Sequence, residues 1–252
     1  MSGTDVTLEQ HGEHVGLVCL HRPPNNYFDT GLIEDIATAY EELDGSGWCR
    51  AIVLASEGRH FCAGLDFAGN AGQDIAALYR AALRLFAAPL PVVAAVQGAA
   101  IGGGCGLALS ADFRVATAQS RFSANFARLG FHHGFALTVT LPAAVGRQAA
   151  ADLLLTGRRV GGEEALALGL CDRLAGDGDV VAQALAYAGE LAASGPLAVR
   201  AIRATLRRGL VEEARRAMEH EYAEQTRLRD TADFAEGLRA AAEMRDPVFR
   251  GE

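Results

Sequence analysis

The stretch PVVAAVQGAAIGGGCGLALSADFRVATAQSRFS, residues 91–123, places an uncharged glycine-rich loop between two apolar runs. Five of the nine residues in GAAIGGGCG, residues 98–106, are glycines. Glycine is costly in regular structure, but it lets the main chain bend tightly or meet a ligand directly. PVVAAV predicts a buried strand before the loop, and CGLALSA predicts a short helix after it. The stretch therefore predicts a strand–loop–helix unit whose loop lets another group approach its backbone.

Similar units precede this stretch. VGLVCL, residues 15–20, predicts a strand that forms a hairpin with the alternating residues before it, and CRAIVLAS, residues 49–56, predicts a buried strand. Apolar residues at helical spacing predict helices over residues 29–44 and 74–88. Strands that alternate with helices indicate an α/β architecture in which helices cover the sheets.

The last quarter of the chain has a different character. Its segments are rich in Ala, Leu, Arg and Glu and predict successive helices, with a joint at Gly195-Pro196. We expect a core over residues 1–190 and a helical region over residues 191–252. This helical layer packs either onto the core or onto another subunit.

Composition limits the classes of function. The chain has 252 residues, half of them hydrophobic, and a net charge of -8, with no concentrated basic stretch. These values argue against nucleic acid or a membrane surface as a partner. The N-terminus lacks the pattern of a signal peptide, and no apolar run approaches the roughly 20 residues of a membrane helix. Five scattered cysteines without metal-ligand spacing indicate reduced thiols, so we expect a cytoplasmic protein without a metal site.

The glycine-rich loop has three possible explanations. A loop between a strand and a helix can bind phosphate, but neither GxxxxGK[ST] nor a GxGxxG pattern in its usual context is present. Tight packing of the strand on the helix is a second explanation. FCAGLDF, residues 61–67, also follows a buried strand and also consists mainly of small residues near its centre. Two such loops could aim two N–H groups at one oxygen and form an oxyanion hole.

Four segments together resemble the crotonase (enoyl-CoA hydratase/isomerase) superfamily in order and spacing. They are RAIVLASEGRHFCAGLDF (50–67), the opening stretch (91–123), TGRRVGGEEALALGLCDRL (156–174) and DFAEGLRAAAEMRDPVF (233–249). The resemblance implies a spiral of ββα units, a C-terminal helical trimerisation region, and a homotrimer or a dimer of trimers. It also implies an acyl-CoA ligand, with coenzyme A as part of the substrate and no separate cofactor. By matching position, the oxyanion donors would be the N–H groups of Ala63 and Gly103.

The sequence departs from this family at the two glutamates of its hydratases. Gly106 stands where the first glutamate would follow GGGC, and Phe126 stands where the second would lie. Neither residue can transfer a proton, although addition of water needs an acid and a base. An apolar ring at Phe126 also argues against a bound bicarbonate that replaces a carboxylate in some relatives.

Other residues remain as candidates for the site. His133 and His132 can act as acid or base near neutral pH, and His133 matches a functional aspartate of naphthoyl-CoA synthases. Both histidines could instead be ordinary loop residues. Weaker candidates that could contact the substrate are Asp66, Asn125, Tyr27 and Arg245, of which Arg245 would meet the phosphates of CoA.

The sequence therefore predicts an acyl-CoA enzyme of the lyase or isomerase type that stabilises a thioester enolate. Isomerisation, an unusual hydration or dehydration, and cleavage of a C–C or thioester bond all remain open. The alternative is an acyl-CoA-binding or assembly subunit without catalytic activity, because both glutamates are missing.

Overall fold

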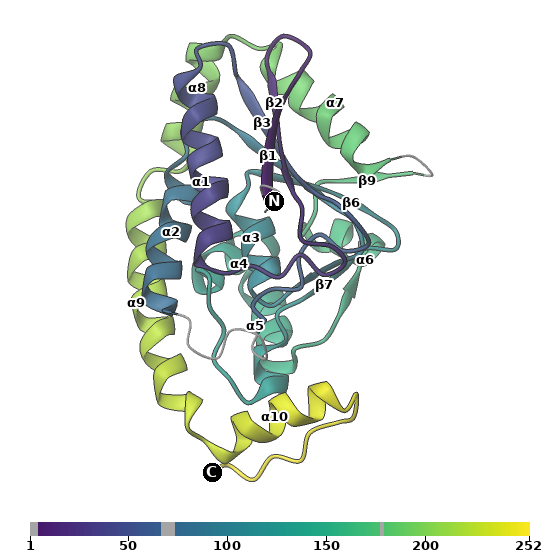
Figure 1. Cartoon of the computed structure of the whole chain (residues 1–252), viewed down its shortest axis with the longest axis vertical. Helices are drawn as coiled ribbons and strands as arrows, with labels where there is room; N and C mark the ends of the chain where they lie inside the picture. The colour runs from purple at the N-terminus through teal and green to yellow at the C-terminus, as the bar shows by residue number, and fades with distance from the viewer. Residues whose placement is uncertain (1–4, 67–73, 177–178) are drawn as a thin grey trace.

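A six-stranded sheet forms the upper half of the molecule (Figure 1). The computed structural model describes residues 5–66, 74–176 and 179–252. In spatial order the strands are β1 (Val6–His11), β2 (Val15–Leu20), β3 (Ala51–Ser56), β4 (Val92–Val96), β6 (Phe113–Thr117) and β9 (Arg173–Ala175). β1 and β2 pair antiparallel and the other pairs are parallel. The predicted N-terminal hairpin and buried strands are confirmed.

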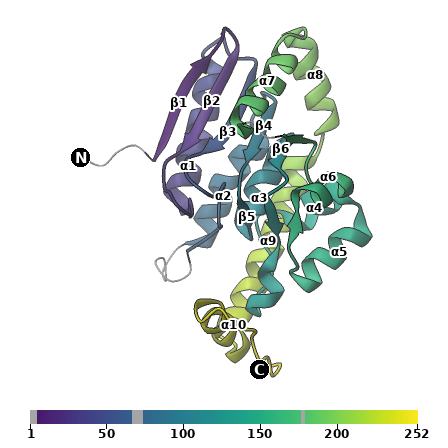
Figure 2. The same cartoon turned by 90° about the vertical axis from the view of Figure 1, so that its right-hand side faces the viewer.

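Helices cover both faces of this sheet. Every residue of β3 is buried, because alternate side chains enter two different cores. Ile52 and Leu54 belong to the main core, whereas Ala51 and Val53 pack with α7 (Val180–Ala192) on the opposite face. In a parallel sheet that is buried on both faces, each strand is a continuous apolar run in the sequence. This accounts for AIVLAS in the sequence and confirms the α/β architecture (Figure 2).

Three helices lie side by side along the main core: α1 (Thr30–Gly45), α2 (Ile75–Ala87) and α9 (Leu210–Arg229) (Figure 1). Two of them begin at an aspartate that caps the helix. The Asp29 carboxylate accepts a hydrogen bond from Leu32 N at 2.9 Å, and the Asp74 carboxylate accepts one from Ala77 N at 3.0 Å. Such caps satisfy N–H groups that have no partner inside the helix. The predicted starts of both helices are therefore confirmed.

One strand of a small second sheet lies inside the region predicted as a glycine-rich loop. This sheet contains β5 (Ala99–Ile101), β7 (Arg121–Ser123) and β8 (Val160–Gly161). Cys62 also forms a bridge with Ala100, so the loop after β3 is joined to β5. α3 (Gly103–Ser110) begins directly after this strand. The prediction of a loop over residues 98–106 was wrong in part, because β5 depends on pairing with segments far away in the sequence and α3 begins two residues before the predicted helix.

The remaining helices complete the molecule. They are the 3₁₀ helix η1 (Asn125–Leu129), α4 (Leu137–Val145), α5 (Arg147–Thr156), α6 (Gly162–Leu168), α8 (Pro196–Leu206) and α10 (Ala232–Ala242). α9 packs on α2 and α4, and α10 crosses the lower end of α9 and packs on η1 (Figure 1). The predicted C-terminal helices are present, and these two pack onto the core of their own chain. A domain boundary near residue 190 stays a prediction.

Two general features bear on function. Within the described residues, no helix is long and apolar enough to cross a membrane, and no cluster of three His, Cys, Asp or Glu side chains is placed to hold a metal ion. All five cysteines are unpaired. Burial raises the pKa of the Cys62 and Cys105 thiols to about 12, so neither is a reactive thiolate at neutral pH.

Candidate active site

A cleft of about 560 Å³ opens where the two glycine loops meet α2, α9, α10 and η1. Its walls are mainly apolar. The aromatic and aliphatic side chains that line it are Phe28, Leu65, Ile75, Leu78, Leu129, Phe126, Phe131, Phe135 and Leu238. Tyr79, Asn125 and Gln225 add polar side chains. A concave apolar pocket with few polar groups is the usual form of a site for a small organic ligand.

The backbones of the two glycine loops touch at the cleft. An ideal Cβ on Gly64 would lie 2.7 Å from Ile101 O and 3.3 Å from Gly103 N. Gly64 also has φ +86°, a backbone conformation that residues with a side chain rarely adopt. Only glycine fits at this position, and its presence brings the N–H groups of residues 65 and 103 to neighbouring places on the cleft wall.

Ala63 does not supply an oxyanion donor. Its N–H group donates a hydrogen bond to Asn25 O at 2.9 Å, so it is already used within the protein. The sequence-based assignment of this donor was therefore wrong. The neighbouring residue Leu65 lines the cleft, and its N–H has no hydrogen-bond partner among the described residues.

Gly103 lines the cleft as predicted. It is the first residue of α3, where N–H groups have no partner inside the helix. Within the described part of the chain the Gly103 N–H likewise has no hydrogen-bond partner. The Phe28 ring covers this glycine closely, since an ideal Cβ at 103 would lie 2.4 Å from Phe28 Cζ. Leu65 and Gly103 therefore present two unpaired N–H groups from two loops in contact.

Aromatic rings occupy the space near both glutamate positions. Phe126 lines the cleft and is 7% exposed. An ideal Cβ on Gly106 would lie 2.6 Å from Phe135 Cβ, so Phe135 takes the room that any side chain at 106 would need. Of the described residues that line the cleft, only Asp66 carries a carboxylate. The described part of the lining therefore contains one carboxylate rather than a pair.

The two histidines lie outside the cleft, whose described lining contains no histidine. His132 Nδ1 bonds with His133 O at 2.8 Å, and His133 Nε2 bonds with Thr138 Oγ1 at 2.9 Å. Because the Thr138 hydroxyl donates to Glu221 at 2.6 Å, His133 Nε2 must be the donor to Thr138. Burial, and then the neighbouring His132 and His220, lower the pKa of His133 to about 4. The structure therefore does not support either histidine as the acid–base group.

The weaker sequence candidates divide into two groups. Asp66, Asn125 and Tyr27 line the cleft, and Tyr27 is more than one-third exposed at its mouth. Arg245 is not among the described lining residues, and its guanidinium binds Glu236 at 2.5 Å and Glu243 at 2.6 Å. The prediction that Arg245 meets the substrate is therefore not supported.

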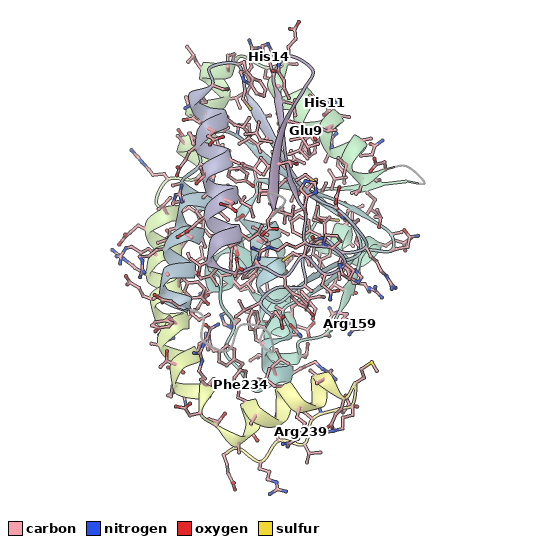
Figure 3. The ribbon with its side chains drawn as sticks, in the orientation of Figure 1. Glu9, His11, His14, Arg159, Phe234 and Arg239 are labelled. Atoms are coloured by element: carbon pink, nitrogen blue, oxygen red, sulfur yellow. The ribbon has the colours of Figure 1, made fainter. Side chains whose placement is uncertain are left out.

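Two other arginines bring positive charge to the cleft. Arg159 and Arg229 both line it and are exposed to solvent. Figure 3 places Arg159 on the side of the molecule that faces α10, and Arg229 is the last residue of α9. Neither arginine forms an ion pair with any described residue, although Arg158 beside Arg159 pairs with Asp152 and Glu164.

Sequence reasoning also missed a polar contact on the cleft wall. The buried Tyr79 hydroxyl donates to Gln225 Oε1 at 3.1 Å, and Gln225 Nε2 donates to His132 O at 3.1 Å. An ideal Cβ on Gly134 would lie 2.0 Å from the Tyr79 hydroxyl oxygen. Gly134 in the segment GFHHGF was the one local signal of this close approach.

Comparisons with known proteins identify the family of the chain. The model of the enoyl-CoA hydratase/isomerase family matches residues 10–252. The chain belongs to the enoyl-CoA hydratase/isomerase family. It is 30% identical to enoyl-CoA hydratase EchA19 of Mycobacterium tuberculosis over an alignment of 260 residues. This alignment covers 99% of this chain and 97% of that protein. This family acts on acyl-CoA thioesters, so the predicted class of ligand agrees with family membership.

Solved structures place the fold in the same family. The enoyl-CoA hydratase/isomerase of Pseudoalteromonas atlantica T6c matches with a TM-score of 0.87 at 29% identity, over 98% of this chain and 100% of that chain. An enoyl-CoA hydratase of Mycobacterium avium subsp. paratuberculosis matches with a TM-score of 0.87 at 26% identity, over 98% and 99% of the two chains. The predicted crotonase-like fold is confirmed.

Proposed function

We propose that this member of the enoyl-CoA hydratase/isomerase family holds the thioester oxygen of an acyl-CoA between the N–H groups of Leu65 and Gly103. These donors would stabilise the enolate that forms when a proton leaves the carbon next to the thioester. Two N–H groups that are fixed in place before the reaction stabilise developing charge without reorganisation. The observation that carries the proposal is the contact between two loops that each present one unpaired N–H.

Isomerisation of an enoyl-CoA double bond fits the cleft better than hydration. A single carboxylate can take a proton from one carbon and return it to another, whereas hydration also needs a group that activates water. Asp66 is the carboxylate of the described lining and takes the role of this base. The aromatic side chains at Phe126 and Phe135 favour the exclusion of water from the reacting carbons.

Arg159 and Arg229 replace Arg245 as the residues that bind the phosphates of CoA. Both line the cleft and have no ion-pair partner in the described part of the chain. An exposed arginine binds phosphate through charge-assisted hydrogen bonds.

The test of this function follows a double-bond shift in 2-enoyl-CoA and 3-enoyl-CoA by NMR. Wild-type protein is expected to interconvert the two esters, and Asp66→Asn is expected to lower kcat by about 10² to 10⁴-fold. His133→Gln serves as the matched control and is expected to keep most of the activity, because His133 lies outside the cleft. Wild-type protein that binds these esters but converts none of them would favour a binding subunit instead.

A further inference from the structure

Phe135 and Gly106 form a matched pair beside the proposed oxyanion hole. Phe135 lines the cleft, is 1% exposed, and packs its ring on Phe28 at 5.5 Å between ring centroids. An ideal Cβ on Gly106 would lie 2.6 Å from Phe135 Cβ and 3.0 Å from its ring carbons Cγ and Cδ1. The absence of a side chain at 106 is thus what makes room for the phenyl ring.

Phe135 and Gly103 line the same cleft, so the place of the ring relative to a bound thioester follows from α3. Gly106 follows Gly103 by three residues in α3, so the two share a face of the helix and lie about 5 Å apart along it. If the thioester oxygen is bound at Gly103, the aromatic wall formed by Phe28 and Phe135 meets the first carbons of the acyl chain. The room at these carbons then depends on the position of Phe135.

The backbone at Phe135 is held in an unusual conformation. Phe135 has φ +61° and Ala136 has φ +59°, so two consecutive residues with side chains lie in the left-handed region. Residues other than glycine rarely adopt it, and such strain persists where surrounding contacts determine the structure and is concentrated at functional sites. The strained turn directs the phenyl ring into the cleft.

A buried carboxylate on α9 fixes this turn. Glu221 is 0% exposed, and its oxygens accept hydrogen bonds from Ala136 N at 2.9 Å, Thr138 N at 3.0 Å and the Thr138 hydroxyl at 2.6 Å. One helical turn further along, Gln225 binds His132 O on the other side of Phe135. Both ends of the loop that carries the ring are therefore anchored to one helix.

We propose that Phe135 determines acyl-group specificity by limiting the cleft to CoA thioesters that are unbranched at the carbons next to the thioester. Glu221 is the positioning residue that holds the ring in place. The inference rests on the proposed function, because it takes an acyl-CoA as the occupant of the cleft and Gly103 as the donor to its oxygen.

The test compares two unreactive thioesters, butyryl-CoA and the α-branched isobutyryl-CoA, by calorimetric titration. Wild-type protein is expected to bind butyryl-CoA at least about 10-fold more tightly, as expected when one methyl group does not fit. Phe135→Ala is expected to reduce this preference to less than about 3-fold by improving the binding of isobutyryl-CoA. Glu221→Gln is also expected to reduce the preference for butyryl-CoA over isobutyryl-CoA, although Glu221 is not among the described residues that line the cleft.

Phe135→Leu and Phe86→Leu form a matched pair of milder variants, because Phe86 is also buried but is not among the described lining residues. Phe135→Leu is expected to reduce the preference, and Phe86→Leu to leave it unchanged. An unchanged preference in folded Phe135→Leu and Phe135→Ala would overturn the inference, as would an equal loss of preference in Phe86→Leu. Wild-type protein that binds neither thioester would overturn the proposed function as well, so the two failures are distinguishable.

Discussion

At the scale of single residues, the site depends on where side chains are absent. Gly64 lets the two loops touch, and Gly106 lets the Phe135 ring occupy the cleft wall. The sequence resemblance also implies that Gly106 stands where a hydratase of the family would have a glutamate. The structure itself shows the effect of this glycine on the shape of the cleft.

Gly106→Ala should lower the free energy of unfolding by about 1–3 kcal/mol, because the new methyl group would overlap Phe135. Gly189→Ala is the matched control, since Gly189 lies inside α7 and its Cβ would meet nothing within 4 Å. This control should be neutral or stabilise the protein by up to about 1 kcal/mol, as expected for alanine in a helix. Urea denaturation measures both changes, and equal stabilities of the two variants would contradict the packing at Gly106.

Sequence alone identified some of these residues and missed others for a physical reason. The loop that contains Gly103 follows from a local pattern, because the glycine run lies between an apolar strand and a helix, and Gly103 itself was assigned through the resemblance to the crotonase superfamily. Ala63 was misassigned because its hydrogen bond to Asn25 joins residues far apart in the sequence. Phe135 was missed because its position depends on Glu221, whose hydrogen bond to Ala136 spans 85 residues.

At the scale of elements, the contact between α4 and α9 contains a buried polar chain. It runs from His133 through the Thr138 hydroxyl to Glu221, and burial raises the pKa of the Glu221 carboxyl. The continuous apolar run of β3 and the helical periodicity of α1 were predictable, because the residues of each element determine which of its faces are buried. The three-residue strand β5 was not, since its pairing with β7 and Cys62 is non-local.

His133 should make stability depend on pH below neutrality. Its pKa is lowered from 6.5 to about 4 in the folded protein, so the unfolded chain binds more protons between these values. The contribution is complete above about pH 6.5 and is lost as the pH falls toward 4, to a total of about 3 kcal/mol. Denaturation of wild-type and His133→Gln protein from pH 7.5 to 4.5 measures the effect. The difference between their free energies of unfolding at each pH separates the contribution of His133 from that of Glu221. A difference that does not change with pH would contradict a buried neutral histidine.

At the scale of the whole molecule, one helix is attached to the core by the ion pairs Arg200–Asp44 and Arg203–Asp112 but presents apolar side chains to solvent. α8 has no buried residue, and its Leu197 and Leu206 are 83% and 81% exposed. Exposed apolar side chains that gather on one element often mark a contact with another protein. This exposure is consistent with the contact between copies of the chain that the sequence resemblance implies.

Light scattering should therefore give a mass of three or six times the 26.5 kDa chain. Leu206→Glu should shift the protein toward smaller species, because it would place a charge in an apolar interface. Leu155→Glu is the control, since Leu155 on α5 is also exposed, at 79%. A wild-type protein of single-chain mass at micromolar concentration would contradict a stable trimer.

The proposed oxyanion hole is tested most directly by the ionisation of a bound 3-oxoacyl-CoA, whose enolate absorbs in the near ultraviolet. Wild-type protein should lower the pKa of the bound ester, because the Leu65 and Gly103 N–H groups stabilise its enolate. Leu65→Pro removes one N–H and should reverse about 2 units of this shift, which corresponds to the loss of one oxyanion donor. Leu65→Ala keeps the N–H and should retain the shift. A bound ester that ionises equally in wild-type and Leu65→Pro protein would contradict the account.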